Sequence, residues 1–474
     1  MGHLKHLTNV EVAEAFLPDI QGMFRWDITR GQWYYFKKFG HAWCEGNKNH
    51  FRVCLTKWLT RYQTILPPVL EGSSSSVALT IQATEKVYQG FKRSLTTAQM
   101  IREIEFLCQN QLTCQQTDFD SAPDLLAMEN GVYNLVTDEF RAGKPEDMIT
   151  KQIPVSYDPN AKCPRFDQFM VEIMPDPSTR LLLQEYFGVC ISGDVIKHFL
   201  IMFGDRDNGK TTLTETIAEI IKPYRMTMEP RIFMQTHFSN DNNTLFYAAK
   251  MPGIRLVVVP EIQNGKMDAS VMKRWCGGDE IAARQPGGRP FSFHPTMKFV
   301  FYTNLEPQQV AADEAFWSRL LKVDFPNTFK GPNCDTTLKS KLLAEKSGIL
   351  NWLIAGYKRF RVEHKLTIPE AVIKSGEKYR ESEDIVGQFI SEHGLRVPNA
   401  ETPVRTIYDS YVSWCERDRR KPIYINNFSK EMVRLGFEKG RFRQQGQDVP
   451  TIKGFIFNPA AAPISSNPDG TMNL

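Results

Sequence analysis

The chain has 474 residues, the length of about three domains, and its hydrophobic, charged and aromatic fractions of 42%, 24% and 11% are those of ordinary globular proteins. No apolar run approaches the about 18 residues that a membrane span needs, and the N-terminus lacks the apolar core of a signal peptide. We therefore expect a cytoplasmic protein without a membrane partner, whose net charge of +4 neither requires nor excludes nucleic-acid binding.

Residues 1–163 are expected to form a mixed α+β domain. Aromatic residues are abundant up to about residue 70, and Arg25–Lys38 is typical of a strand, a glycine turn and a second strand. The aromatic cluster fits a base-stacking surface, but we favour the core of a small domain because large aromatic side chains are usually buried. Asn130-Gly131 indicates a tight turn between short strands. The nine cysteines include no C-x-x-C pair, which argues against a zinc site.

Helical spacing over Phe166–Val189, broken at Pro175–Pro177, predicts one or two helices beside the domain that follows. That domain contains the motif G-x-x-x-x-G-K-[ST] after an apolar strand pattern and before a helical one. In this context the glycines let backbone amides surround phosphate oxygens, the lysine reaches the β- and γ-phosphates, and the next hydroxyl binds Mg²⁺. The sequence therefore predicts binding of ATP and Mg²⁺ by Gly204, Asp205, Arg206, Asp207, Asn208, Gly209, Lys210, Thr211 and Thr212.

Three further side chains are candidates for the same site, because apolar strands and helices alternate from His198 to Phe325 as in a parallel α/β sheet. Glu261 follows one buried-strand pattern and is a candidate for holding magnesium or polarising the attacking water. Asn304 follows the next strand and can orient water against the γ-phosphate. Arg319 stands just before a further strand, where an arginine is either ion-paired in its own chain or able to reach the γ-phosphate of a neighbouring subunit.

A basic stretch between the acid and the amide suggests a β-hairpin with a Gly-Gly tip. Such a hairpin can hold a phosphodiester backbone, although a solvated basic loop has the same composition. The candidates for DNA binding are Lys273, Arg284, Arg289, His294 and Lys298.

The rest of the chain is expected to be helical over 336–383 and to form a winged helix over 384–460, with three helices before two short strands. Residues 401–460 hold eleven Lys or Arg against seven Asp or Glu, which fits a phosphate-facing surface as well as a solvated basic face. The tail, 461–474, is expected to be disordered.

The order of these motifs resembles superfamily 3 helicases of the poxvirus and phage/plasmid primase-helicase family. That family has a phosphate loop, a strand with one acid, a K-x-x-[ST]-G-G-D segment, a hairpin, an F-x-x-x-x-N strand and a W-x-R finger. The matching elements here are Gly204–Thr211, Glu261, Lys273 with Gly277–Asp279, Asn304, and Trp317–Arg319. Cys276 stands where the family usually has Ser or Thr, so a hydroxyl is missing. Moderately specific likeness extends over about residues 20–460.

The resemblance implies an AAA+ ATPase domain over 164–335, in a ring that is usually hexameric and moves 3′-to-5′ on single-stranded DNA. Arg319 would then act in trans, the Lys273 segment and the hairpin would line the channel, and the winged helix would bind duplex DNA at a fork or dock a partner protein. Many relatives carry a primase domain upstream, but we reject Asp118-Phe-Asp120 as its metal-binding pair because too few residues precede it. Priming would come from another primase or polymerase. Two alternatives stay open, an ATP-gated DNA-binding initiator with little unwinding and a monomeric kinase.

Overall fold

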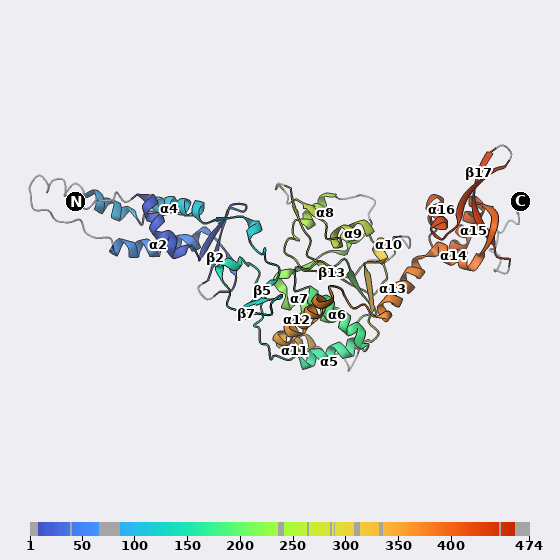
Figure 1. The fold of residues 1–474 in the computed structure, drawn as a ribbon, viewed down its shortest axis with the longest axis horizontal. Helices are drawn as coiled ribbons and strands as arrows, with labels where there is room; N and C mark the ends of the chain where they lie inside the picture. Colours follow the sequence, from blue (N-terminus) through green and yellow to red (C-terminus); the bar gives the residue numbers. More distant parts are fainter. Residues whose placement is uncertain are drawn as a thin grey trace, which may run out of the picture.

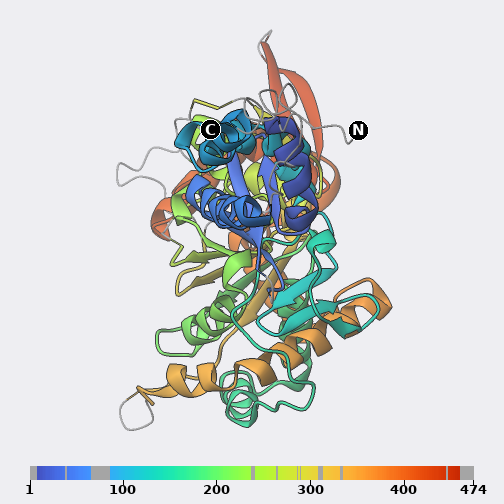
Figure 2. The same ribbon diagram turned by 90° about the vertical axis from the view of Figure 1, so that its left-hand side faces the viewer.

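The fold is known from a computed structural model, which describes residues 8–37, 40–65, 86–235, 241–262, 265–284, 287–288, 290–307, 313–330, 335–444 and 447–459. The molecule is elongated, with an N-terminal lobe and a C-terminal domain on either side of a central body (Figure 1). Figure 2 views the same arrangement from the N-terminal end. None of the described helices is long and apolar enough to cross a membrane.

The N-terminal lobe packs helices against a small sheet whose strand order is β3-β2-β1-β4. The expected strand, turn and strand are present, and Gly31 takes a φ of +64° at the turn, which favours glycine. Trp33 is buried and stacks on Phe51 with ring centroids 4.1 Å apart, so the aromatic cluster is a core rather than a base-stacking surface. The elements are α1 (Asn9–Ile20), β1 (Phe24–Asp27), β2 (Gln32–Phe36), β3 (Trp43–Gly46), α2 (Lys48–Ile65), α4 (Ala98–Gln111) and β4 (Thr113–Cys114).

A second small sheet joins this lobe to the central body. The turn predicted at Asn130-Gly131 connects its first two strands, where Met128 pairs with Gly131. Leu126 and Tyr133 of this sheet belong to the main hydrophobic core, so the predicted boundary at residue 163 falls inside a shared core. Its strands are β5 (Leu125–Met128), β6 (Gly131–Asn134) and β7 (Phe140–Arg141), and the 3-10 helices η1 (Gln116–Asp118) and η2 (Pro145–Asp147) lie beside them in the chain.

The central body is built on a five-stranded sheet in the order β14-β8-β13-β10-β9, and every strand pair in it is parallel. Both faces of the sheet are covered by apolar cores: Leu200 and Met202 face one, and Phe199 and Ile201 face the other. This alternation explains the continuous apolar run that precedes the phosphate-loop motif. The strands are β8 (Phe199–Phe203), β9 (Arg225–Thr227), β10 (Leu256–Pro260), β13 (Lys298–Thr303) and β14 (Leu320–Asp324).

Helices cover both faces of this sheet, and α6 packs directly against α12. A Cβ atom on Gly356 of α12 would lie 2.0 Å from the backbone oxygen of Gln184 in α6, so the two backbones touch. Residues 336–383 therefore belong to the central core. The helices are α5 (Pro164–Ile173), α6 (Pro177–Val189), α7 (Lys210–Ile220), η3 (Lys222–Tyr224), η4 (Pro230–Phe233), α8 (Asp241–Ala248), α9 (Ala269–Cys276), α10 (Glu314–Trp317), α11 (Leu338–Ala344), α12 (Lys346–Glu363) and α13 (Glu370–Glu383).

The C-terminal domain contains three helices and a three-stranded antiparallel sheet in the order β15-β17-β16. The three helices and the last two strands were expected, whereas the strand at Gly394–Pro403 was not. Asp384 ends α13 and caps the next helix by accepting from the amide of Gly387, at 2.9 Å. The elements are α14 (Ile385–His393), β15 (Gly394–Pro403), α15 (Val404–Arg417), α16 (Ile425–Arg434), β16 (Glu438–Gln444) and β17 (Gln447–Phe457). The tail, 461–474, lies outside the described residues.

Candidate nucleotide-binding site

The phosphate-loop motif connects β8 to α7 at the carboxyl edge of the parallel sheet, where open α/β folds bind their ligands. Two of its glycines have positive φ angles, +146° at Gly204 and +87° at Gly209. A Cβ atom at Gly204 would lie 2.6 Å from Nδ2 of Asn208, and one at Gly209 would lie 2.4 Å from Cγ2 of Ile173. Both positions therefore require glycine, for conformation and for space.

Lys210 is buried at the start of α7, and its ammonium group lies inside the loop. Nζ donates to the backbone oxygens of Gly204 and Asp205, at 2.6 and 2.8 Å, and to Oδ1 of Asn208, at 2.9 Å. Burial lowers the pKa of Lys210 to about 8, an effect that the neighbouring Asp205 partly offsets. A phosphate group bound in the loop would stabilise the charged form of this partly desolvated ammonium group.

The remaining loop residues also fit a phosphate ligand. Nδ2 of Asn208 is buried and has no acceptor among the described residues, so an unused donor lies within the loop. Asp205, Arg206 and Asp207 are exposed, and Thr211 and Thr212 lie in the first turn of α7, where amide groups are free of helical partners.

Asn304 and Glu261 lie at the same edge of the sheet as the loop. Asn304 follows β13, the strand beside β8, and its Oδ1 accepts from Nζ of Lys210 at 3.3 Å. Glu261 follows β10, is exposed, and takes a φ of +49°, which is unusual for a residue other than glycine. Its amide donates to the backbone oxygen of Tyr302 at 2.9 Å. The structure thus brings together Lys210 and Asn304, with Glu261 one strand further along.

Sequence reasoning missed Tyr302, the residue before Thr303 at the end of β13. Burial raises its pKa, as do the charges of Glu215 and Glu261, whereas the nearby Thr211 side chain lowers it. Tyr302 therefore stands near the predicted magnesium-binding hydroxyl, on the strand that precedes Asn304. The sequence itself shows only that Tyr302 ends an apolar strand pattern two residues before Asn304.

Arg319 lies at the opposite, amino edge of the sheet. Its backbone oxygen accepts from the amide of Phe199, the first residue of β8, whereas the phosphate loop begins after Phe203, the last. At about 3.3 Å per residue, the intervening strand separates the two ends by roughly 13 Å. Arg319 donates to the backbone oxygen of Ala315 at 2.5 Å, and its Nε is buried without an acceptor among the described residues. The geometry excludes Arg319 from the loop of its own chain.

The predicted basic hairpin is formed by β11 (Ile281–Ala283) and β12 (Phe291–Phe293), which are antiparallel. Arg284 follows the first strand and His294 follows the second, and both are exposed. Arg289 lies outside the described residues. Lys273 is on α9 and forms an ion pair with Asp313 at 3.2 Å.

The prediction of Lys298 as a DNA-binding residue is wrong. Lys298 begins the central strand β13, is fully buried, and donates to the backbone oxygens of Ser192, Asp194 and Thr296 at 2.9, 3.2 and 2.9 Å. Burial lowers its pKa to about 7. A lysine that satisfies three buried carbonyl groups supports the fold and cannot reach a ligand at the surface.

A second buried lysine, Lys322 of β14, borders the phosphate loop. Its Nζ contacts Oε1 of Glu306 at 2.9 Å, Oδ1 of Asp324 at 2.6 Å and Oγ of Ser375 at 3.1 Å. Glu306, Lys322 and Asp324 line a cavity of about 380 Å³ that reaches Gly204 and Asp205. Because Glu306 is two residues after Asn304, the cluster ties the turn that carries Asn304 to β14 and α13.

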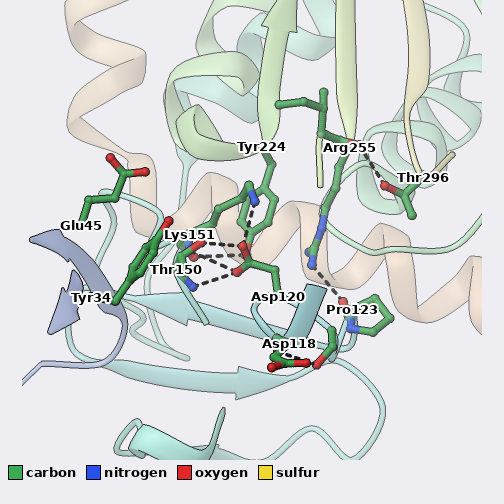
Figure 3. Close-up of polar contacts among 12 residues, drawn as sticks. Tyr34, Glu45, Asp118, Asp120, Pro123, Thr150, Lys151, Tyr224, Arg255 and Thr296 are labelled. Atoms are coloured by element: carbon green, nitrogen blue, oxygen red, sulfur yellow. Dashed lines mark hydrogen bonds and ion pairs between the residues drawn. The ribbon is translucent and has the colours of Figure 1, made fainter. Parts of the chain in front are cut away.

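Asp118 and Asp120, rejected above as a metal-binding pair, have separate structural partners (Figure 3). Asp120 forms an ion pair with Lys151 at 2.8 Å and accepts from the amide of Thr150, so its pKa is lowered despite burial. Oδ2 of Asp118 accepts from the amide of Gln115.

The same region links the small sheets to the main one, because Tyr224 and Arg255 of the central body donate to backbone oxygens of Lys151 and Pro123. The guanidinium of Arg255 also stacks on the ring of Tyr224, with its Cζ atom 4.0 Å from the ring centroid.

The fold and the site define the class of the protein, an α/β protein with a phosphate-loop motif at the carboxyl end of a parallel sheet. Two families match the chain: one described as D5 N terminal like over residues 13–175, and one of unknown function, DUF5906, over residues 202–319.

The chain is also similar to viral proteins whose names are provisional. A helicase of Acanthamoeba polyphaga mimivirus is 25% identical over 429 residues, 82% of this chain and 43% of that protein. A helicase of Invertebrate iridescent virus 6 is 30% identical over 239 residues, 47% of this chain and 24% of that protein. A primase of African swine fever virus is 22% identical over 344 residues, 66% of this chain and 35% of that protein. The chain thus spans less than half the length of these curated relatives.

Among solved structures, the apo form of the C-terminal region of NrS-1 is similar over 94% of this chain and 99% of its own, at 9% identity and a TM-score of 0.49. The family and sequence matches support a likeness to viral and phage primase-helicases, with a D5-like N-terminal region over residues 13–175.

Proposed function

We propose that the chain is an ATP-dependent replicative DNA helicase of a virus, phage or plasmid-like mobile element. The observation that carries the proposal is the contact between Lys210 and Asn304 at the phosphate loop, together with Arg319 at the opposite edge of the same sheet. In this proposal one chain supplies the phosphate-binding part of a site, and its Arg319 serves the site of another copy. Relatives with provisional names of helicase and primase support a role in DNA replication.

The nucleotide in this proposal is ATP with Mg²⁺. The loop amides and Lys210 bind the phosphates, the Thr211 hydroxyl and the Glu261 carboxylate hold the metal, and Mg²⁺ neutralises charge on the phosphates when it is bound. Glu261 also polarises the attacking water, which the amide of Asn304 orients against the γ-phosphate. The position of Thr211 in the first turn of α7, near Tyr302, supports this arrangement.

The assembly in this proposal is a ring, a hexamer by family resemblance, in which Arg319 completes the neighbouring site. Single-stranded DNA passes through the channel 3′-to-5′, in contact with Lys273 and with Arg284, Arg289 and His294 of the hairpin, a sequence-independent mode of binding.

The architecture in this proposal is a three-layer AAA+ core followed by a winged helix. Helices on both faces of the sheet support the first, and the order of helices and strands in the C-terminal domain supports the second. A separate primase or polymerase supplies primers, and the complex works in the host cytosol.

Strand displacement on a forked duplex tests the proposal, with Lys210→Ala as the inactive control. We expect ATP-dependent displacement by the wild type and none by the variant. ATP hydrolysis and ring assembly without displacement would instead identify an ATP-gated initiator. Hydrolysis by a monomer, insensitive to Arg319→Ala, would identify a kinase-like enzyme.

A further inference from the structure

One edge strand of the C-terminal domain carries a row of basic side chains on a single side. Lys439, Arg441 and Arg443 occupy alternate positions of β16 and are all exposed. Side chains two residues apart point to the same side of a strand, so these three lie in line at intervals of about 6.8 Å. We call them the basic ridge.

The basic ridge lies on the side of the hairpin that faces the helices. Phe437 and Ile452 are on this side, because Phe437 is two residues before Lys439 and Ile452 pairs with Lys439. Both are buried in one core with Phe428 and Met432 of α16. The strand that carries the ridge therefore runs outward from the domain core, and Figure 1 shows its partner β17 projecting from the C-terminal domain.

The ridge carries free positive charge. No acidic side chain forms an ion pair with a ridge residue in the part of the chain that the structure describes. Asp448 pairs with Arg443 across the hairpin. When its negative charge is included, the ridge still has a net charge of about +2. By contrast, Arg434 at the end of α16 is bound by Asp384 and Glu431, at 2.6 and 2.7 Å.

We propose that the basic ridge of β16 binds the phosphate backbone of duplex DNA. Charges in line at this spacing suit successive phosphates of one strand of a duplex rather than a single small anion. Single-stranded DNA is bound by basic groups interleaved with aromatic rings, but Phe442, the aromatic residue between Arg441 and Arg443, points to the other side of the strand. The ridge lies on β16 and contacts phosphates rather than bases, so we expect binding that is independent of base sequence.

Duplex binding in the absence of nucleotide tests the proposal. The variant Lys439→Gln/Arg441→Gln/Arg443→Gln removes the ridge charges. The matched control Arg405→Gln/Arg417→Gln/Lys453→Gln removes three charges of the same domain that are already ion-paired with Asp409, Asp418 and Glu401. Fluorescence anisotropy measures the Kd for two duplexes of unrelated sequence over a range of salt concentrations.

We expect the ridge variant to lower the slope of log K against log salt by about 2.7, because each lost phosphate contact contributes about 0.9. The advantage of the wild type over the variant then grows about 40-fold as salt falls from about 200 to about 50 mM. The control keeps the wild-type slope, and both duplexes give the same result. An unchanged slope in the ridge variant, or an equal change in the control, overturns the proposal.

Two further measurements separate this proposal from the helicase function. Duplex binding is measured without nucleotide. Absence of ATP hydrolysis would therefore refute the helicase function, while duplex binding by the basic ridge could still be measured. Affinity for a single-stranded oligonucleotide is expected to stay at the wild-type value in the ridge variant, and an equal loss there would overturn the assignment to duplex DNA. Thermal unfolding checks the fold, and Arg441→Gln/Arg443→Gln, further from the core, replaces the triple variant if that one unfolds.

Discussion

Oδ1 of Asn304 lies 3.3 Å from Nζ of Lys210, although 94 positions separate the two residues in the chain. The contact exists because β13 lies beside β8 and runs parallel to it, so that their carboxyl ends meet at one edge. Asn304 is exposed next to the loop, where its amide can act on a ligand, whereas its contact with Lys210 adds little to the core.

Replacing Asn304 by Ala is expected to lower kcat for ATP hydrolysis by about 10²-fold, the effect of losing one preorganised polar group, with little change in nucleotide affinity. Steady-state kinetics and nucleotide titration check this split. Asn351→Ala is the control, because Asn351 of α12 makes side-chain hydrogen bonds to Asp158 and Ala161 instead. Loss of nucleotide binding in Asn304→Ala, with kcat preserved, would contradict the assignment.

Arg319→Ala is expected to retain nucleotide binding and lose hydrolysis, by about 10³-fold or more if it neutralises transition-state charge as other such arginines do. A mixing experiment identifies the subunit on which it acts. Arg319→Ala and Lys210→Ala are each inactive alone, but a mixed assembly contains interfaces in which one copy supplies Lys210 and its neighbour supplies Arg319. Recovery of activity on mixing is the expected result, and its absence in assembled mixtures would refute action in trans.

The affinity for ATP is expected to decrease as pH rises above about 8. Burial lowers the pKa of Lys210 to about 8 in the free protein, while bound phosphate favours the charged ammonium. Binding therefore takes up a proton above this pH, so full affinity is present below it and is lost by about tenfold per pH unit above it. Titration of ATP between about pH 7 and about pH 9 measures the effect. Lys210→Arg, which stays charged throughout, should show a flat profile if it binds.

Lys298→Met is expected to destabilise the fold by about 2–4 kcal/mol, because it leaves three buried carbonyl oxygens without their donor. Denaturant unfolding measures the loss. His294→Ala, at an exposed position near the hairpin, should change stability by less than about 0.5 kcal/mol. Single-stranded DNA affinity of the folded Lys298→Met protein should equal that of the wild type, and a specific loss of affinity would restore Lys298 to the channel.

Lys322→Met is expected to lower stability by about 1–3 kcal/mol, since Glu306 and Asp324 keep their charges beside a cavity but are partly exposed to solvent. The turn that carries Asn304 loses its anchor at Glu306, so kcat should decrease while the KM for ATP changes little. Lys322→Arg is expected to recover part of the lost stability and part of the lost kcat. Equal kcat values in Lys322→Met and the wild type would show that the cluster does not position Asn304.

The sequence pattern was sufficient to predict how the site is arranged along the sheet. A phosphate loop after one apolar strand, an acid after another and an amide after a third must meet at one edge if the strands are parallel, and Lys210 and Asn304 do meet. The magnesium-binding role of Glu261 and the trans role of Arg319 stay predictions.

Other features depend on packing that no local pattern contains. Lys298 follows a basic stretch and resembles a surface residue in the sequence. In the structure it begins the central strand, and its Nζ donates to the backbone oxygens of Ser192 and Asp194. β15 was missed because most of its ten residues are exposed, and its pairing with β17 is interrupted by a register shift. Tyr302 could not be distinguished from a core aromatic residue without its neighbour Thr211.

The backbone contact between α6 and α12 has a consequence for dissecting the protein. Gly356 and Gln184 touch so closely that any larger side chain at Gly356 would separate the helices, and α12 comes after the last strand of the sheet. A fragment that stops at residue 335 would contain all five strands yet expose the apolar surface of α6. The smallest piece that can be expressed in soluble form should therefore extend through α13, and limited proteolysis should release the C-terminal domain before it cuts between α6 and α12.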